Sequence, residues 1–365
     1  MGEETNLSTL SLSAIAIGSL PHSDAQSATD LIWNNFEDVP FWPQLSKVDA
    51  REDMIIQFTQ NIPGMVVNNE EKTFYFDSES EDFYAELEDF YTDYSDIVEL
   101  GNIEKLANYG IKDNYSSSID LFLSKVRENK PKYAKGQITG PFTWGTSITD
   151  INKKCIFYDE TYKDILIKAL ALKALWQINK IKEASPETTP IIFLDEPTMS
   201  QFGTSAFITV QKEDVQNAFK EIINIIKQNG ALVGVHCCGK ADWDLILDCN
   251  PDIINFDTFA FSKSITAYAD KISNFIKNNG FIAWGIVPTL DSEALSKSNA
   301  ESLTNKLEDS IDLICRKGLD KEKLLMHSII TPSCGAGGLN IELATKAMEI
   351  VNVISKNMKN KYGEI

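Results

Sequence analysis

The chain has 365 residues, 43% of them hydrophobic, and its 53 acidic and 34 basic residues give a net charge of −19. That hydrophobic content suits a globular protein with a sizeable core. The excess of negative charge disfavours nucleic acid and anionic membranes as partners, because both would be repelled. No run of 18 apolar residues predicts a membrane span, and MGEETNLSTL lacks the basic start and apolar core of a secretory signal. We therefore expect a cytoplasmic protein.

Short apolar runs, each ending in a polar or glycine-containing segment, recur along the chain and predict β-strands. There are eight of them, at residues 14–19, 41–45, 134–140, 191–195, 232–237, 253–257, 282–287 and 326–331. Helix-like segments lie between them, among them 161–184 and 212–230. This alternation predicts a (β/α)8 TIM barrel, an α/β fold, rather than an open doubly wound sheet.

The interval between the second and third predicted strands interrupts the alternation. Residues 46–133 contain a predicted hairpin at 65–76 and acidic, aromatic helical sequence at 81–94. We interpret 46–133 as an insertion after strand 2 that covers one rim, within a single domain spanning 1–365. Its acidic stretch predicts a solvated helix face, with a docking surface for a partner as the alternative.

The fifth predicted strand ends in an unusual run, VHCCG, at residues 235–239. His236 and Cys238 are separated by one residue, so in an extended strand both side chains point to the same side, while Cys237 points away toward a helix. Zinc favours imidazole nitrogen and thiolate sulfur. In a reducing compartment, cysteines are expected to be ligands or buried thiols rather than disulfides.

Two further residues at strand ends complete a predicted zinc site. Cys334 follows the eighth predicted strand in TPSCGAGG, where glycines allow the backbone to approach closely. Asp257 ends the sixth predicted strand and offers a fourth, oxygen ligand. In a TIM barrel the carboxyl ends of the strands carry the catalytic residues, which supports this grouping. The alternative is that the histidine and cysteines only pack inside a buried strand.

Several motifs together resemble the catalytic C-terminal half of cobalamin-independent methionine synthase. They occur in the same order over roughly residues 14–340 and are IGSLPH (17–22), AREDMI (50–55), TGP (139–141), DEP (195–197), His-x-Cys (236–238) and PSCG (332–335). HCCG and GPFT are also similar to segments of corrinoid-to-thiol methyltransferases and of the uroporphyrinogen decarboxylase superfamily.

The resemblance implies a zinc-dependent transfer of a methyl group to the thiol of homocysteine, giving methionine. His236, Cys238 and Cys334 would be permanent zinc ligands, and Asp257 stands where the family has a glutamate that gives way to substrate. The implied substrate-binding residues are Gly18, Ser19, Asp195 and Glu196. Backbone N–H groups near Ser19 would hold the carboxylate and Asp195 the α-ammonium group. A strand-to-helix turn is the alternative for DEP, and His22 is left unassigned.

The chain departs from the family in ways that bear on the methyl donor. It begins almost directly at IGSLPH, whereas the full-length enzymes have another barrel. Val287 and Pro288 stand where the family has a histidine that protonates the departing methylfolate, and the tryptophan that stacks on folate is out of register, Trp144 being the nearest. Methylfolate is a poor donor without that acid, whereas cobalt(I) leaves a methylcorrinoid unprotonated. We therefore expect a methylcorrinoid donor, carried by a corrinoid protein, with methyltetrahydrofolate second.

Three other functions stay open. A methylcorrinoid:small-thiol methyltransferase of the coenzyme M type would share the zinc ligands without needing Asp195 and Ser19. A porphyrinogen decarboxylase would need no zinc, but it should have basic residues near the first strand, which IGSLPHSDAQ lacks. The third alternative is a non-catalytic barrel that binds a corrinoid protein and in which zinc has a structural role. Its zinc would have four protein ligands and would not exchange one for a thiol.

Overall fold

The computed structural model describes residues 7–68 and 73–363, and its centre is one parallel sheet. The strands, in spatial order, are β3 (Tyr133–Thr139), β4 (Thr189–Asp195), β5 (Leu232–Cys237), β6 (Ile253–Phe256), β7 (Phe281–Val287) and β8 (Ser328–Pro332). They correspond to six of the eight predicted strands. Almost every strand residue is buried, as expected for parallel strands covered on both faces.

The prediction of a closed eight-stranded TIM barrel is wrong: the structure has a six-stranded parallel half-barrel and a small separate antiparallel sheet. The predicted strands at 14–19 and 41–45 form no ladder and make only isolated bridges, which join Ala14 to Ile330, Ser19 to Gln44, and Phe41 to Lys135. Gly18 has φ +149°, outside the range of a regular strand. Pro40 and Pro43 have no N–H to donate to a neighbouring strand. These residues interrupt the pairing that closure requires.

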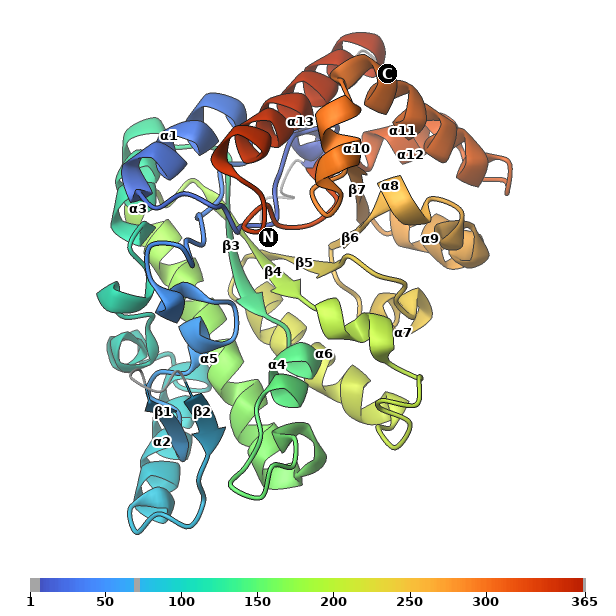
Figure 1. Cartoon of the computed structure of the whole chain (residues 1–365). Helices are drawn as coiled ribbons and strands as arrows, with labels where there is room; N and C mark the ends of the chain where they lie inside the picture. Colours follow the sequence, from blue (N-terminus) through green and yellow to red (C-terminus); the bar gives the residue numbers. More distant parts are fainter. Residues whose placement is uncertain (1–6, 69–72, 364–365) are drawn as a thin grey trace.

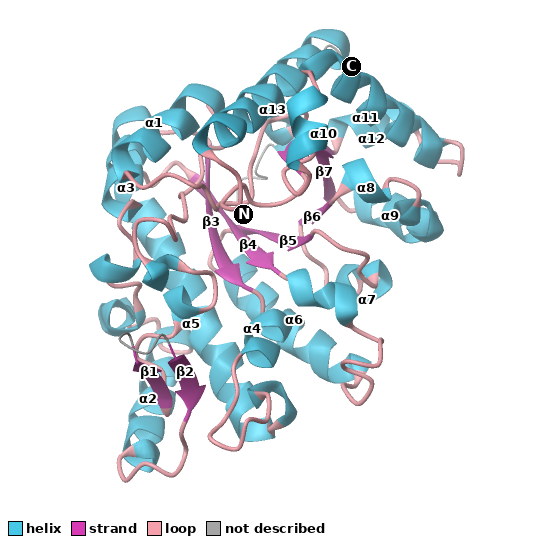
Figure 2. Cartoon of the chain, in the orientation of Figure 1, coloured by secondary structure: helices cyan, strands magenta, loops and turns pink. Residues whose placement is uncertain are grey.

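Helices surround the sheet, as Figures 1 and 2 show. They are α1 (Ala25–Asn35), α4 (Pro141–Ser147), α5 (Glu160–Ala184), α6 (Lys212–Gln228), α7 (Trp243–Leu247), α8 (Thr258–Phe261), α9 (Ala269–Lys277), α10 (Ser292–Lys297), α11 (Ala300–Cys315), α12 (Lys321–Met326) and α13 (Ile341–Tyr362). The predicted helices at 161–184 and 212–230 are confirmed as α5 and α6. Over the described ranges, no helix is both long enough and apolar enough to cross a membrane.

The described residues of the segment 46–133 form a layer beside α5 (Figure 1). The predicted hairpin is confirmed by the antiparallel pair β1 (Met65–Asn68) and β2 (Thr73–Phe76); the expected turn between them lies outside the described residues. The predicted helix is confirmed as α2 (Phe83–Val98), and α3 (Ile119–Asn129) follows. A short part of the layer reaches the carboxyl end of β3, where Thr139 Oγ1 donates to Met54 O at 2.5 Å.

The apolar core has two parts. On the concave face of the sheet a compact cluster contains Leu10, Ile15, Val39, Tyr133, Ile191, Phe193, Ile253, Phe281, Ala283 and Ile329. A larger cluster joins the convex face to the helices. Toward the carboxyl ends of the strands the concave face becomes polar, with buried Asp195, His236, Asn255 and Thr331. The fold therefore places a polar layer directly above an apolar floor.

Candidate metal centre

Three of the predicted metal ligands come together. One ligand atom each from His236, Cys238 and Cys334 lies within 4.8 Å of the other two. His236 is on β5, and Cys334 follows β8, three strands further along in the sheet order. In a flat sheet those strands would be roughly 14 Å apart at ordinary strand spacing. The curvature of the half-barrel therefore brings these ligands together.

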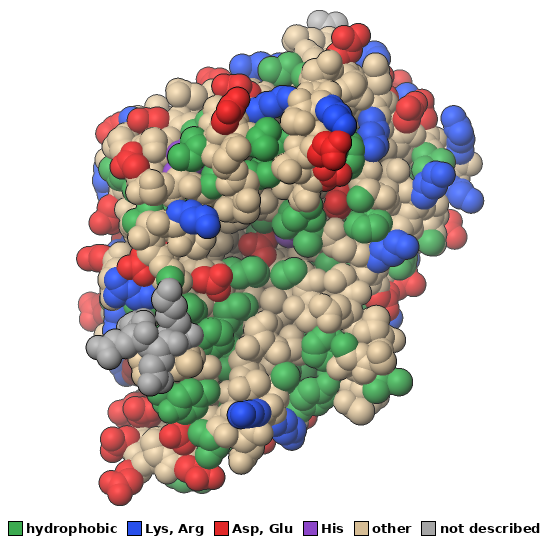
Figure 3. All heavy atoms as spheres, in the orientation of Figure 1, with side chains coloured by type: hydrophobic (Ala, Val, Ile, Leu, Met, Phe, Trp, Pro, Cys, Tyr) green, Lys and Arg blue, Asp and Glu red, His purple; other side chains and the backbone are tan. Residues whose placement is uncertain are grey.

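The alternation expected along β5 is confirmed. His236 is 2% exposed. Cys237 is buried in the larger apolar cluster between the convex face of the sheet and the helices, with its Sγ 3.8 Å from Gly239 O. Cys238 and Cys334 are partly exposed. Figure 3 shows a hollow near the middle of this face, in which acidic and histidine side chains are visible. The sulfurs of Cys238 and Cys334 are therefore partly accessible to solvent, whereas the imidazole of His236 is buried.

The loop carrying Cys334 is held by a threonine and by the N-terminal segment. Thr289 Oγ1 donates to Cys334 O at 2.8 Å and accepts from Cys334 N at 3.0 Å. A Cβ at Gly335 would lie 2.1 Å from Ser19 Oγ, so any larger residue there would force the Ser19 side chain to move. Ala336 N donates to Ser19 O at 2.9 Å. The predicted substrate-binding residue Ser19, with Gly18 before it, therefore lies against the cysteine loop.

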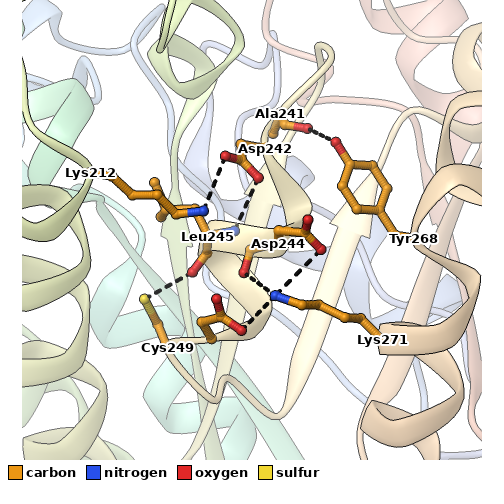
Figure 4. A network of polar contacts seen from close by, with 9 residues as sticks. Lys212, Ala241, Asp242, Asp244, Leu245, Cys249, Tyr268 and Lys271 are labelled. Atoms are coloured by element: carbon orange, nitrogen blue, oxygen red, sulfur yellow. Dashed lines mark hydrogen bonds and ion pairs between the residues drawn. The ribbon is translucent and has the colours of Figure 1, made fainter.

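The loop after Cys238 is fixed by a polar network, seen in Figure 4. Asp242 caps α7 by accepting from Leu245 N at 3.1 Å and pairs with Lys212 at 3.5 Å. Lys271 of α9 pairs with Asp244 at 3.4 Å and with Asp248 at 2.7 Å. These contacts tie α7 to α6 and α9, which restrains the chain immediately after the ligands.

The electrostatics of the site stabilise a thiolate. A hydrogen bond from Cys334 lowers the pKa of Cys238 to about 4, with His236 acting in the same direction. The same hydrogen bond, together with burial, raises the pKa of Cys334. Because the thiolate is the form of cysteine that binds metals, Cys238 is prepared for that role.

Asp195 and Glu196 are adjacent in DEP but have different surroundings. Asp195 lies opposite His236 across the β4–β5 pair and is 8% exposed. Its Oδ1 is buried without a hydrogen-bond partner among the described residues. Burial raises its pKa to about 6, against the opposing charge of Lys135. Asp195 therefore has an acceptor oxygen that no group in the described part of the chain uses.

The Glu196 carboxylate is fully engaged. It accepts hydrogen bonds from Phe142 N at 2.9 Å, from Thr143 N at 2.8 Å and from Thr143 Oγ1 at 2.6 Å. These donors belong to the first turn of α4, so Glu196 links the start of that helix to the end of β4 by hydrogen bonds. Although the sequence placed it with the substrate-binding residues, the structure gives it this internal contact.

Asp257, the predicted fourth ligand, is not part of the three-ligand cluster among the described residues. Its Oδ1 accepts from Ala260 N at 2.8 Å and caps α8. Burial raises its pKa to about 6, and Cys238 and His236 also act on it. Asp257 therefore lies near the cluster with one oxygen already in use.

Sequence reasoning missed the residues that support the ligands. Asn255 contacts His236, and Thr289 holds Cys334. A signal for Asn255 was present, because it is the one polar residue inside the buried run IINF. No comparable signal existed for Thr289, whose partner lies 45 residues away.

A pocket of about 480 Å³ lies elsewhere, between α3 and α5, with Ile119, Leu123 and Trp176 in its lining and none of the candidate ligands.

No model of a known protein family matches this chain, and neither does any curated protein.

Proposed function

We propose that this protein is a zinc-dependent methyltransferase that transfers a methyl group to the thiol of homocysteine. The observation that carries the proposal is the cluster of one imidazole and two cysteine sulfurs within 4.8 Å. Catalytic zinc sites have three protein ligands and one open position, and thiolate and imidazole are preferred zinc ligands. A buried His236 Nε2 without a partner among the described residues, and a Cys238 whose pKa is lowered, fit such a metal.

Zinc in this site would deprotonate a substrate thiol that occupies the open position. The protein's own residues would bind the substrate, orient it and exclude water. The sulfurs of Cys238 and Cys334 are partly exposed, and the apolar cluster beneath the polar layer excludes water from below. A thiol has an ordinary pKa near 8.5, so without such help it is mostly protonated at neutral pH.

An amino-acid thiol is favoured as acceptor by Asp195. Its unpartnered, buried oxygen lies across the strand pair from His236, where the α-ammonium group of homocysteine would satisfy it. Ser19 contacts the loop that carries Cys334, and this contact supports a role for the backbone near Gly18 and Ser19 in holding the α-carboxylate.

For the donor we propose a methylcorrinoid, carried by a corrinoid protein, with methyltetrahydrofolate second. Val287 ends β7, and Pro288 and Thr289 follow it, so this strand end supplies no titratable acid to protonate a departing amine. Departure of cobalt(I) needs no such acid.

The test measures zinc content and turnover of the anaerobically purified protein. We expect one zinc per chain and methionine formed from homocysteine and methylcobalamin, with cob(I)alamin as the second product. Methyltetrahydrofolate should give much less product. If turnover needs a dedicated corrinoid protein, free methylcobalamin should react slowly and the loaded partner faster.

A matched pair of cysteine variants makes this test specific. Cys334→Ser should lose bound zinc and all turnover, because one of the three ligands is gone. Cys315→Ser should retain both, since Cys315 is also a partly exposed free cysteine but ends α11, outside the cluster. A wild-type protein without zinc would refute the proposal, and equal turnover with coenzyme M would favour the small-thiol alternative.

A further inference from the structure

The imidazole of His236 is held by a buried amide that belongs to no motif in the sequence. His236 Nδ1 hydrogen-bonds to Asn255 Oδ1, and Asn255 is 0% exposed. The two residues are register partners on the adjacent strands β5 and β6. The contact is therefore made by the sheet itself and not by a loop that can rearrange.

The orientation of this amide is determined by its other contacts. Asn255 Nδ2 donates to Ala283 O at 2.8 Å and to Thr331 Oγ1 at 2.8 Å. A carbonyl oxygen only accepts, so the amide nitrogen must face Ala283 and the amide oxygen must face His236. That oxygen also only accepts, so the hydrogen in the contact belongs to His236 Nδ1.

We propose that Asn255 fixes His236 as its Nδ1–H tautomer and thereby presents the Nε2 lone pair as the ligand atom. The inference rests on the proposed metal site. Nε2 is buried and has no hydrogen-bond partner in residues 7–68 and 73–363, so binding a metal would satisfy it. Asn255 is a positioning residue, because it acts on the metal through His236.

A neutral amide suits this site better than the carboxylate that often supports a ligating histidine. Two thiolates already balance the charge of Zn²⁺, and a substrate thiolate would add a further negative charge. A carboxylate hydrogen-bonded to the ligating histidine would repel that thiolate across a short, poorly screened distance. Asn255 supplies the orientation without the charge.

The first measurement is a long-range ¹H–¹⁵N correlation spectrum of protein labelled in its three histidines, zinc-loaded and metal-free. The His236 signals are identified by their loss in His236→Gln. We expect zinc to shift Nε2 strongly while Nδ1 keeps its hydrogen. Zinc bound through Nδ1, or an Nε2–H tautomer in metal-free protein at alkaline pH, would overturn the proposal.

The second measurement compares zinc affinities by competition with a chelator. Asn255→Leu should weaken zinc binding about 10- to 100-fold, the usual cost of losing the group that hydrogen-bonds to a ligating histidine. Thr331→Val is the matched control, because it removes one contact of the same amide while Asn255 still bonds to Ala283 O and His236. We expect it to change the affinity less than about threefold.

The outcomes separate this inference from the proposed function. Unchanged zinc affinity in folded Asn255→Leu would refute the positioning role. If that variant does not fold, the wild-type spectra still decide which nitrogen carries the hydrogen. If wild-type protein binds no zinc, the proposed function fails, and the metal-free spectrum alone tests the tautomer.

Discussion

At the scale of single residues, the motif DEP shows how adjacent carboxylates acquire different roles. Asp195 ends β4 on the concave face, and its Oδ1 has no hydrogen-bond partner among the residues that the structure describes. Glu196 points toward the first turn of α4 and accepts three hydrogen bonds there. The sequence placed both in the substrate site, and only the contacts of each carboxylate distinguish them.

This difference leads to a prediction for Asp195→Asn. The variant keeps the size of the side chain but loses the charge that would pair with an α-ammonium group. We expect KM for homocysteine to rise about 10- to 100-fold, as for the loss of a buried charge pair. A thiol without an ammonium group should react as before, which steady-state kinetics with both thiols would measure.

Asp291→Asn is the control for Asp195→Asn. Asp291 is an exposed residue that follows β7 and caps α10 by accepting from Ala294 N at 2.8 Å, a bond that asparagine can also make. It makes the same charge change outside the hollow and should leave both reactions unaltered. A similar loss with both thiols in Asp195→Asn would point to a structural role for Asp195.

At the scale of elements, the junction of β6, β7 and β8 sets the position of Cys334. The pairing of β7 with β8 shifts register between Gly285 and Val287. A Cβ at Gly285 would lie 2.4 Å from Phe256 O and 2.9 Å from Ser333 Cα, both of them backbone atoms. The residue before the cysteine ligand therefore packs directly on a glycine.

Gly285→Ala should consequently disturb both stability and metal binding. We expect the free energy of unfolding to fall by about 1–3 kcal/mol, the usual cost of overpacking a core. Zinc affinity should fall as well, because Ser333 cannot move without moving Cys334. Urea unfolding and chelator competition measure the two effects. Gly338→Ala is the control. Gly338 lies in the loop that carries Cys334 but faces open space, so this change should alter neither the stability nor the zinc affinity.

At the scale of the whole molecule, α5 joins the sheet to the layer formed by residues 46–133. It is buried on both sides for this reason, and its Lys173 is 1% exposed. Lys173 Nζ donates to Gln60 O at 2.7 Å and to Gly110 O at 3.4 Å, both in that layer. Burial, with a smaller effect of Lys112, lowers the pKa of Lys173 to about 7.

The lowered pKa of Lys173 predicts a pH dependence of stability. The unfolded lysine has a pKa of about 10.4, so from about pH 7 to 10.4 the unfolded chain binds a proton that the folded chain releases. Stability should therefore rise with pH through that window. Between about pH 7 and 9.5 the contribution is on the order of 3 kcal/mol by this linkage.

Lys173→Met should abolish that part of the rise, as urea unfolding at both pH values would show. Lys125→Met is the control, since Lys125 is a surface residue 3.7 Å from Glu128. It should keep the wild-type slope. An unchanged slope in Lys173→Met would mean that Lys173 stays protonated in the folded protein.

The local sequence determined the elements and the kinds of ligand. Patterns within a few residues predicted six of the strands, the helices at 161–184 and 212–230, and the outward direction of Cys237. Such patterns suffice because neighbours along the chain set periodicity and burial. The three residues of the candidate metal cluster were also predicted from residue type and strand end. The distance between them could not be predicted from the sequence, because it depends on how the strands pair across the sheet.

Tertiary structure decided the rest. Residues 14–19 and 41–45 carry a strand pattern, yet Gly18 and two prolines prevent a continuous ladder, and the sheet stays a six-stranded half-barrel. Likewise the support of His236 by Asn255, and of Cys334 by Thr289, joins residues 19 and 45 positions apart. Such contacts depend on sheet curvature and register, which arise from long-range pairing and are not encoded in any single segment.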